Sequence, residues 1–390
     1  MKAFEFSTTK TIISEPGSIQ RLAEICESQG IKTPFVVTDG GIVACGLMDV
    51  LKQALASSNL DIAYFTDVVA DPAEDIVLSA VDAAVSHKAD GIIGFGGGSS
   101  MDTAKLVALL ANKDSSNSGQ KLSDLYGINQ AKGERLPLIL IPTTAGTGSE
   151  VTQIAIVTTG ESTKAGVVAP QLLPDIAVLD AELTTGLPAL VTAATGIDAM
   201  VHAIEAYTSA HKKNLYSDLL AKQALELLSQ NIEQACADGD NIEARQCMLL
   251  GACMAGQAFA NSPVGAVHAL AYPLGGRFHI PHGLSNSLVL PHVIRFNAKQ
   301  AATLYAELAP HISANINMSQ EPEAISYDLA GHFELLIKRL KLPTTLKEMG
   351  ITVDQLDMLA DDAMLQTRLL INNPKKVIRE DALAIYKAAY

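Results

Sequence analysis

The sequence predicts an α/β domain with a doubly wound parallel sheet, followed by an all-helical domain. In the first half of the chain, short β-branched runs alternate with amphipathic helical stretches, a pattern typical of parallel sheets covered by helices. From about residue 190 onward the apolar residues recur with helical period, and no alternating strand pattern appears. A chain of 390 residues is also longer than a domain with a single hydrophobic core usually is, so we expect two domains, 1–188 and 189–390.

The elements follow in order along the chain. Strands of the first domain are predicted at 34–39, 62–68, 91–95 and 136–144. Its helices are predicted at 47–58, 73–88 and 101–112. The polar segment 113–127 is expected to be a surface excursion. In the second domain, long helical patterns cover 195–210, 217–236, 243–259, 301–312 and 323–340.

Composition limits the possible partners and compartment. The net charge of −14 repels phosphate backbones, and no Lys/Arg-rich run is present, so nucleic acid is not expected as a partner. The five cysteines are odd in number and none are at CxxC spacing, which favours a reduced, cytoplasmic setting. The N-terminus lacks the pattern of a signal peptide. No apolar run reaches 18 residues, so no membrane span is expected.

A glycine-rich loop stands between a buried strand and a helix, in GFGGGSSMDTAK (94–105). Glycines there let a ligand approach the backbone, and the start of the helix offers free N–H groups to an anion. The alternative is a tight turn without a ligand. The loop is not a GxGxxG fingerprint, because the candidate acidic residue, Asp39, precedes the glycines instead of following them.

A second loop, IPTTAGTGSEVT (141–152), leaves the most apolar strand. Small hydroxyl residues and glycines just beyond the carboxyl end of a strand are suited to hold a polar ligand. The alternative is a turn whose hydroxyls are satisfied internally. Two such loops in one α/β domain favour a ligand-binding role over turns that bind no ligand.

Carboxylate and imidazole groups cluster in the second half. Asp198 and His202 stand four residues apart and so project from one helix face, where they could bind Zn²⁺ or Fe²⁺ or simply form an ion pair. Four histidines follow within a short stretch: His268, His279, His282 and His292. One carboxylate and three imidazoles would fill a four-ligand site. Spacing alone does not say which of the four histidines bind a metal.

These motifs, in this order, resemble the iron-containing (group III) alcohol dehydrogenase family. The resemblance covers nearly the whole chain, from GGGSSMDTAK through PTTAGTGSE, DAELTTGLP, GIDAMVHAIEAY and HIPHG to the C-terminal NNPKKVIREDALAIYKAAY. It implies a dehydroquinate synthase-like architecture, with an N-terminal dinucleotide-binding domain, a C-terminal helical domain and a metal in the cleft between them. It also implies a homodimer or a higher homo-oligomer.

The resemblance assigns roles position by position. It implies that the metal ligands are Asp198, His202, His268 and His282. The pyrophosphate of the cofactor would meet Gly97, Gly98 and Ser99, with Asp102 close by. The nicotinamide side would be lined by Thr143, Thr144, Thr147 and Ser149. Lys164 matches a lysine near the nicotinamide ribose, or is a plain surface lysine. Asp39 matches the position at the adenosine ribose, or is a helix-capping aspartate.

A carboxylate at residue 39 would accept hydrogen bonds from the 2′-hydroxyl and repel a 2′-phosphate, which favours NAD over NADP. Two positions depart from the family pattern. Many members carry a histidine, often assigned to proton handling, where this chain has Tyr272, and a tyrosine is a poor proton acceptor at neutral pH. An asparagine near the adenine pocket is Asp71 here. His279 is a candidate to orient a metal ligand or the proton path.

The expected reaction is metal-assisted hydride transfer between a small alcohol and NAD, with Fe²⁺ or Zn²⁺ polarising the substrate oxygen. In the reverse direction the substrate is an aldehyde or ketone. One alternative is a metal-dependent lyase or cyclase of the dehydroquinate synthase kind, which uses NAD transiently. That chemistry needs a phosphate-binding basic cluster, for which Lys164 and Arg277 are only scattered candidates. A non-catalytic binding or filament module is a third hypothesis. The sequence does not identify the alcohol.

Overall fold

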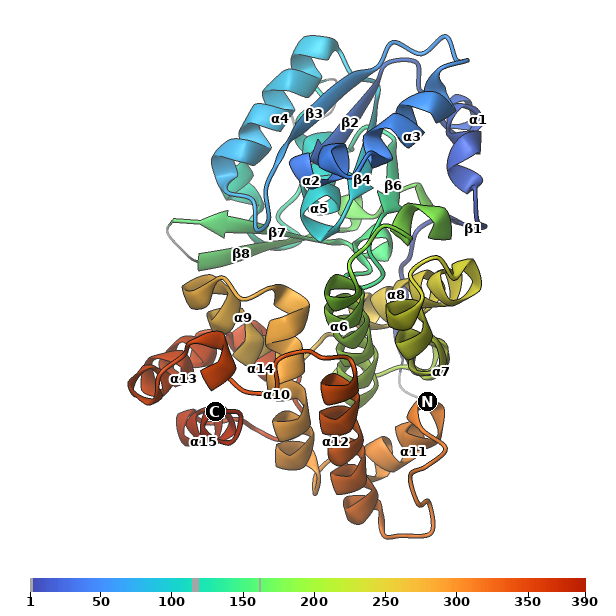
Figure 1. Cartoon of the computed structure of the whole chain (residues 1–390). Helices are drawn as coiled ribbons and strands as arrows, with labels where there is room; N and C mark the ends of the chain where they lie inside the picture. The colour runs from blue at the N-terminus through green and yellow to red at the C-terminus, as the bar shows by residue number, and fades with distance from the viewer. Residues whose placement is uncertain (1–2, 114–118, 161–162) are drawn as a thin grey trace. The chain divides into compact units, whose positions relative to one another are not determined.

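The computed structural model of the chain describes residues 3–113, 119–160 and 163–390. It forms two compact units (Figure 1). The first in sequence, the nucleotide unit, covers Ser7–Gly186, and the helical unit covers Leu187–Tyr390 together with the N-terminal residues up to Phe6. The N-terminal residues join the helical unit because Phe4 and Phe6 pack their rings against Tyr216. The division therefore differs from the expected boundary at residue 188 by two residues and by this N-terminal segment.

The nucleotide unit is built on a six-stranded sheet in which every pairing is parallel. In spatial order the strands are β1 (Thr11–Ser14), β9 (Ile176–Leu179), β6 (Leu138–Pro142), β4 (Gly91–Gly96), β2 (Pro34–Asp39) and β3 (Ala63–Val68). The chain runs from β2 to the edge strand β3 and then returns to place β4 on the opposite side of β2. The strand order therefore reverses between β2 and β4, and ligands of open α/β sheets bind at the carboxyl ends of strands at such a reversal.

Helices cover both faces of this sheet, as the apolar strands predict. The helices are α1 (Leu22–Ser28), α2 (Gly40–Ala44), α3 (Leu47–Leu55), α4 (Glu74–His87) and α5 (Gly98–Leu110). On one face, α1 and α3 pack against one set of alternating side chains, which includes Val36, Ile93 and Ile139. On the other face, α4 and α5 pack against the next set, which includes Val37 and Ile92. The doubly wound prediction is confirmed.

A second, three-stranded sheet was not expected from the sequence. It contains β5 (Gly127–Ile128), β8 (Thr163–Val168) and β7 (Ile154–Thr159), and β7 and β8 form an antiparallel pair. Its inner side packs with α4 and α5 in a separate apolar cluster. Within the expected surface excursion, residues 114–118 lie outside the described part of the chain, and Leu122–Leu125 forms a short 3-10 helix with two buried leucines.

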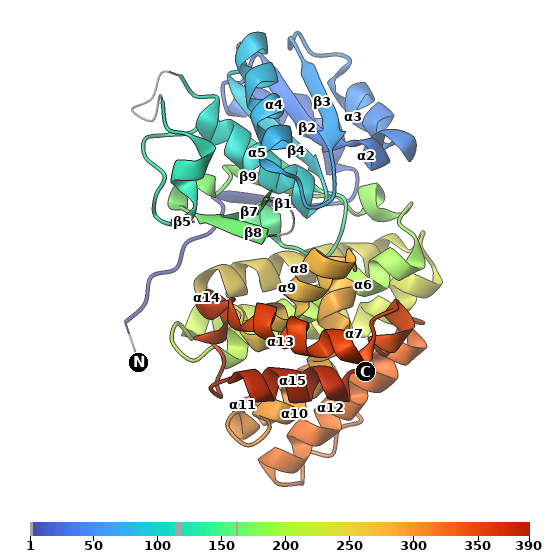
Figure 2. The ribbon, with the colours of Figure 1, turned by 90° about the vertical axis from the view of Figure 1, so that its left-hand side faces the viewer.

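The helical unit contains no strand among its described residues, as predicted. Its helices are α6 (Ala189–Thr208), α7 (Leu215–Ala237), α8 (Ile242–Asn261), α9 (Ala266–Phe278), α10 (His282–Asn297), α11 (Ala302–Ile312), α12 (Pro322–Arg339), α13 (Leu356–Met364), α14 (Thr367–Leu370) and α15 (Arg379–Ala388). In this unit α6 is central and packs against α7, α8 and α10, while α13 and α15 lie side by side (Figure 2).

The central helix α6 is long and apolar enough to cross a membrane by length and composition alone. Of its most apolar stretch, 78% is buried inside the protein. Its hydrophobicity is therefore explained by its position in the core of the helical unit, where it carries the polar residues described next.

Candidate metal centre and nucleotide loops

Helix α6 carries two buried polar side chains on one face. Asp198 is 2% exposed and His202 is 4% exposed, and their spacing of one helical turn places them together, as the sequence predicts. The His202 ring stacks on Phe259 of α8, with the ring centroids 4.2 Å apart. This packing fixes the orientation of the imidazole.

The other two histidines come from the starts of α9 and α10. His268 is the third residue of α9 and is buried, whereas His282 is the first residue of α10 and its side chain is 40% exposed. Helix α10 comes very close to α6 at Gly283, where an added Cβ would lie only 2.3 Å from the backbone oxygen of Ala194. Only glycine allows this approach, which brings His282 to the face of α6 that carries Asp198.

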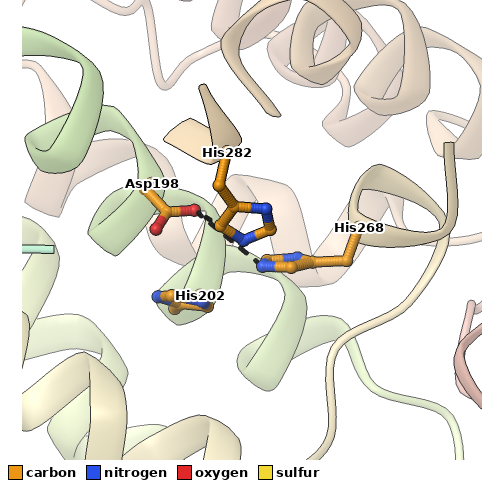
Figure 3. Close-up of side chains that lie close together, drawn as sticks. All are labelled: Asp198, His202, His268 and His282. Carbon is orange, nitrogen blue, oxygen red and sulfur yellow. Dashed lines mark ion pairs between the residues drawn. The ribbon is translucent and has the colours of Figure 1, made fainter. Parts of the chain in front are cut away.

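The four side chains converge on one point (Figure 3). Each of Asp198, His202, His268 and His282 offers a ligand atom, and these atoms lie within 4.8 Å of one another. The Asp198 Oδ1 atom is 3.6 Å from His282 Nε2 and 3.9 Å from His268 Nε2. One carboxylate and three imidazoles at such separations match the ligand types of Zn²⁺ and of Fe²⁺. The structure therefore gathers the four residues that the resemblance assigns to the metal.

The electrostatics of this group also suit a cation. Burial alone would raise the pKa of the Asp198 carboxyl, but the three histidines and the amide of Asn286 together hold that pKa below its ordinary value. The Asn286 Nδ2 atom donates to Asp198 Oδ1 at 2.5 Å, and it lies 3.4 Å from His268 Nε2 and 3.3 Å from His282 Nε2. A buried carboxylate is costly unless positive charge or hydrogen bonds compensate it, so a divalent ion fits these residues.

The two residues expected to act in catalysis lie in different places. Tyr272 is one turn beyond His268 on α9, and its ring centroid is 5.9 Å from that of His282. His279 caps the opposite end of α9 in a left-handed conformation with φ 54°, is exposed, and lies outside the four-residue group. The structure therefore places Tyr272 beside the candidate metal centre and leaves His279 outside the four-residue group.

In the nucleotide unit, Asp39 and the glycine loop flank the reversal of strand order. Asp39 ends β2, and Gly97 is the residue before α5, just beyond the end of β4. One oxygen of the Asp39 carboxylate caps α2 by accepting from the backbone N–H groups of Gly41 and Ile42, and the other accepts from Ser100 Oγ at 2.8 Å. Asp39 is thus a helix cap at the place where a cofactor ribose is expected. Its contact with a ribose stays a prediction.

The two predicted loops lie against each other. The backbone N–H of Thr143 donates to the oxygen of Gly96 at 3.0 Å. An added Cβ at Gly98 would lie 2.9 Å from Thr147 Cγ2, so glycine is needed for this close approach, while Thr144 is near Gly97. The first N–H groups of α5, from Gly98 onward, have no acceptor within a helix and suit an anion such as pyrophosphate.

Asp102 and Ser149 join the two loops through a buried lysine. Lys105 is fully buried, and its ammonium donates to Ser149 Oγ at 2.7 Å, Thr152 Oγ1 at 3.0 Å and the Ile154 carbonyl at 2.7 Å. Asp102 accepts from Ser149 Oγ at 2.6 Å and from the backbone N–H of Ile156 at 2.9 Å. The structure thus shows Asp102 and Ser149 bracing the loops, and a direct contact of either with a cofactor stays a prediction.

Lys164 is largely buried rather than a plain surface lysine. Its side chain is 15% exposed and forms an ion pair with Asp71. The backbone N–H of Asp71 in turn donates to Ser99 Oγ at 3.2 Å. The departure from the family pattern at residue 71 therefore provides a partner for the lysine expected at the nicotinamide ribose.

Together these features define a class of two-domain protein. Its first domain has a parallel sheet with loops suited to bind a ligand, and its second is helical and carries a cluster of side chains suited to bind a metal. Residues 9–181 match the family described as iron-containing alcohol dehydrogenase. Residues 192–390 match the C-terminal part of the Fe-containing alcohol dehydrogenase family. The chain therefore belongs to the iron-containing alcohol dehydrogenase family, whose reaction is the oxidoreduction of alcohols.

The similarity to individual proteins extends along the whole chain. It is 40% identical to long-chain-alcohol dehydrogenase 1 of Geobacillus thermodenitrificans, over 96% of this chain and 93% of the relative. The structure is similar to that of a 1,3-propanediol oxidoreductase, with TM-score 0.94, 31% identity and full coverage of both chains. It is also similar to a sulfoacetaldehyde reductase from Bifidobacterium kashiwanohense in complex with NAD⁺, with TM-score 0.87, 28% identity and coverage of 100% and 99%. These comparisons support the dehydrogenase reading and give no support to the lyase alternative.

Sequence reasoning missed three side chains that shape these sites. Glu205 is three residues beyond His202, and Asn286 is four residues beyond His282, so helical spacing could have pointed to both. Lys105 stands in the quoted GGGSSMDTAK motif, where only its complete burial distinguishes it from a surface lysine.

Proposed function

We propose that this alcohol dehydrogenase depends on a divalent metal held by Asp198, His202, His268 and His282, and on NAD bound by the loops of the nucleotide unit. The observation that carries the proposal is the convergence of four donor atoms within 4.8 Å in the helical unit, three of them on buried residues. Fe²⁺ is the ion that the family description favours, and Zn²⁺ suits the same ligands. When bound, the ion supplies Lewis acidity toward the oxygen of an alcohol or a carbonyl substrate.

The residues of the chain have distinct tasks in this proposal. Asn286 and the stacked Phe259 hold the ligands in place before the ion binds. The hydroxyl of Tyr272, beside His282, hydrogen-bonds the substrate or a water in the position where many relatives have a histidine. Asp39 favours NAD over NADP by charge repulsion of a 2′-phosphate. We expect a small primary alcohol or the corresponding aldehyde as substrate.

Cellular setting and assembly complete the proposal. All five cysteines are free, which fits a reduced cytoplasm. The charge of −14 makes nucleic acid an unfavourable partner. We expect a homodimer or a higher homo-oligomer, as the resemblance implies.

The test is NADH formation by metal-free protein mixed with NAD and a panel of alcohols, with and without added Fe²⁺ or Zn²⁺. Metal-restored absorbance at the NADH band is expected for the native sequence. His268→Ala removes one of four ligands and should lose both bound metal and turnover. His211→Ala is the matched control, because this exposed histidine lies in the same unit outside the group. A His268→Ala protein that keeps both metal and turnover contradicts the proposal.

A further inference from the structure

Glu205 lies on α6, about one helical turn beyond His202. It is only 5% exposed, and both oxygens of its carboxylate face the start of α9. The Oε2 atom is 2.6 Å from His268 Nδ1, and the Oε1 atom accepts from the backbone N–H of Val267 at 2.7 Å. This buried carboxylate therefore contacts the candidate ligand His268 at its Nδ1 atom, although Glu205 is not itself a member of the four-residue group.

We propose that Glu205 is a positioning residue of the metal centre, which fixes the ring of His268 so that its Nε2 atom faces the metal. The inference rests on the metal role proposed above for His268. The contact with Glu205 occupies the Nδ1 atom of the ring, so the Nε2 atom on its other side is the nitrogen left to face a metal.

The surroundings of Nε2 agree with this assignment. The Asn286 Nδ2 atom lies 3.4 Å away, and an amide N–H can donate only to an unprotonated ring nitrogen. Asp198 Oδ1 lies 3.9 Å from the same atom, on the side where the four ligand atoms converge. A carboxylate behind a histidine that faces a metal is a recurrent device, which orients the ring and raises its basicity.

Glu205 also caps the first turn of α9. The residue before this helix is Gly265, which offers no side chain to cap it. The N–H of Val267 lies in the first turn, where a helix has no acceptor of its own, and Glu205 supplies both the acceptor and a negative charge. One side chain on α6 thus fixes the helix that carries His268 and the ring itself.

This double role predicts the effect of an amide. Both partners of Glu205, His268 Nδ1–H and the Val267 N–H, are donors, and a glutamine has only one oxygen. Glu205→Gln therefore places its NH₂ group against one of the two donors. Against His268 Nδ1–H it displaces the ring or reverses its tautomer, and against the Val267 N–H it displaces the start of α9, which carries His268. Each change moves the lone pair of Nε2 away from the metal.

The experiment measures metal binding by metal-free protein rather than turnover. The affinity for Co²⁺ is obtained by competition with a chelator, and the visible absorption of bound Co²⁺ reports its coordination geometry. For Glu205→Gln we expect the affinity for Co²⁺ to fall by about 10- to 100-fold, the loss typical when a residue that hydrogen-bonds a metal ligand is replaced. We also expect an altered Co²⁺ spectrum. The matched control is Glu307→Gln on α11. It removes a carboxylate that accepts at 2.5 Å from Tyr207, which lies on α6 like Glu205, and that is not a member of the four-residue group. It should leave affinity and spectrum unchanged.

A Glu205→Gln protein with the native Co²⁺ affinity and spectrum would overturn the inference. If this variant does not fold, Glu205→Asp replaces it, since its shorter side chain keeps the charge and reaches only one of the two donors. Weaker Co²⁺ binding by Glu205→Asp then supports the inference, and native binding overturns it. A failure of the unsubstituted protein to bind Co²⁺ would instead refute the proposed metal-dependent function.

Discussion

Glu150 offers a quantitative test of the electrostatics within the nucleotide unit. It lies in the short 3-10 helix Ser149–Val151, directly after the second loop, and is 2% exposed. Burial raises the pKa of its carboxyl from 4.5 to about 7, although a backbone hydrogen bond and the ammonium of Lys105 lower it in part. Replacing it by glutamine keeps the shape of the protonated acid and removes the ionisation.

The sign of the effect follows from the raised pKa. Between pH 4.5 and about 7 the folded chain holds a proton that the unfolded chain has lost, so stability is highest below this interval and falls as the pH rises through it. At ~1.4 kcal/mol per pKa unit, the free energy of unfolding falls by about 3 kcal/mol across this interval. Glu150→Gln does not lose this stability, so its advantage over the native sequence should grow from less than ~1 kcal/mol at pH 5 to about 3 kcal/mol at pH 8.

The assay is thermal unfolding of the metal-free protein at a series of pH values, followed by far-UV circular dichroism because the chain contains no tryptophan. For a unit of this size, about 3 kcal/mol corresponds to a difference in midpoint on the order of 10 °C at pH 8. The control is Glu24→Gln, in which an exposed carboxylate of the same unit is replaced. If the difference between Glu150→Gln and the native protein were the same at pH 5 and pH 8, the reasoning would be refuted.

Two further predictions concern the loops. Lys105→Met should destabilise the nucleotide unit by about 3 kcal/mol, because it leaves the Ile154 carbonyl and the Asp102 carboxylate without the buried ammonium; a urea midpoint within error of the native value would contradict this. Asp71→Asn should lower the KM for NAD by up to about five-fold, since it frees Lys164 from a partly exposed ion pair of about 1 kcal/mol or less. An unchanged or higher KM would show that this lysine does not meet the cofactor.

Much of the fold follows from local patterns in the sequence. The buried strands β2 and β4 are continuous apolar runs that end at an aspartate and at glycines, and these runs indicate parallel strands directly. The four-residue strands β1 and β9 were not predicted, because such short segments carry little periodic signal. The antiparallel pair β7–β8 was also missed, since its Thr- and Gly-containing strands resemble loops.

The candidate metal centre was only partly visible in the sequence. The pair Asp198 and His202 follows from helical spacing, but the choice among the later histidines depends on how α9 and α10 pack against α6, which spacing does not encode. Spacing alone left His279 and His282 both open, the family resemblance chose His282, and the close approach at Gly283 gives the structural reason. Glu205 was overlooked because a glutamate on a helix is usually a solvent-exposed residue.

The partition of the chain has a practical consequence for engineering. All four candidate ligands and Glu205 belong to the helical unit, whereas the glycine loop, Asp39 and Lys164 belong to the nucleotide unit. Substitutions in sites without shared partners usually add in free energy. Libraries for cofactor preference and for choice of metal can therefore each be confined to one unit, and a combined variant that departs from additivity would reveal energetic coupling between the substitutions.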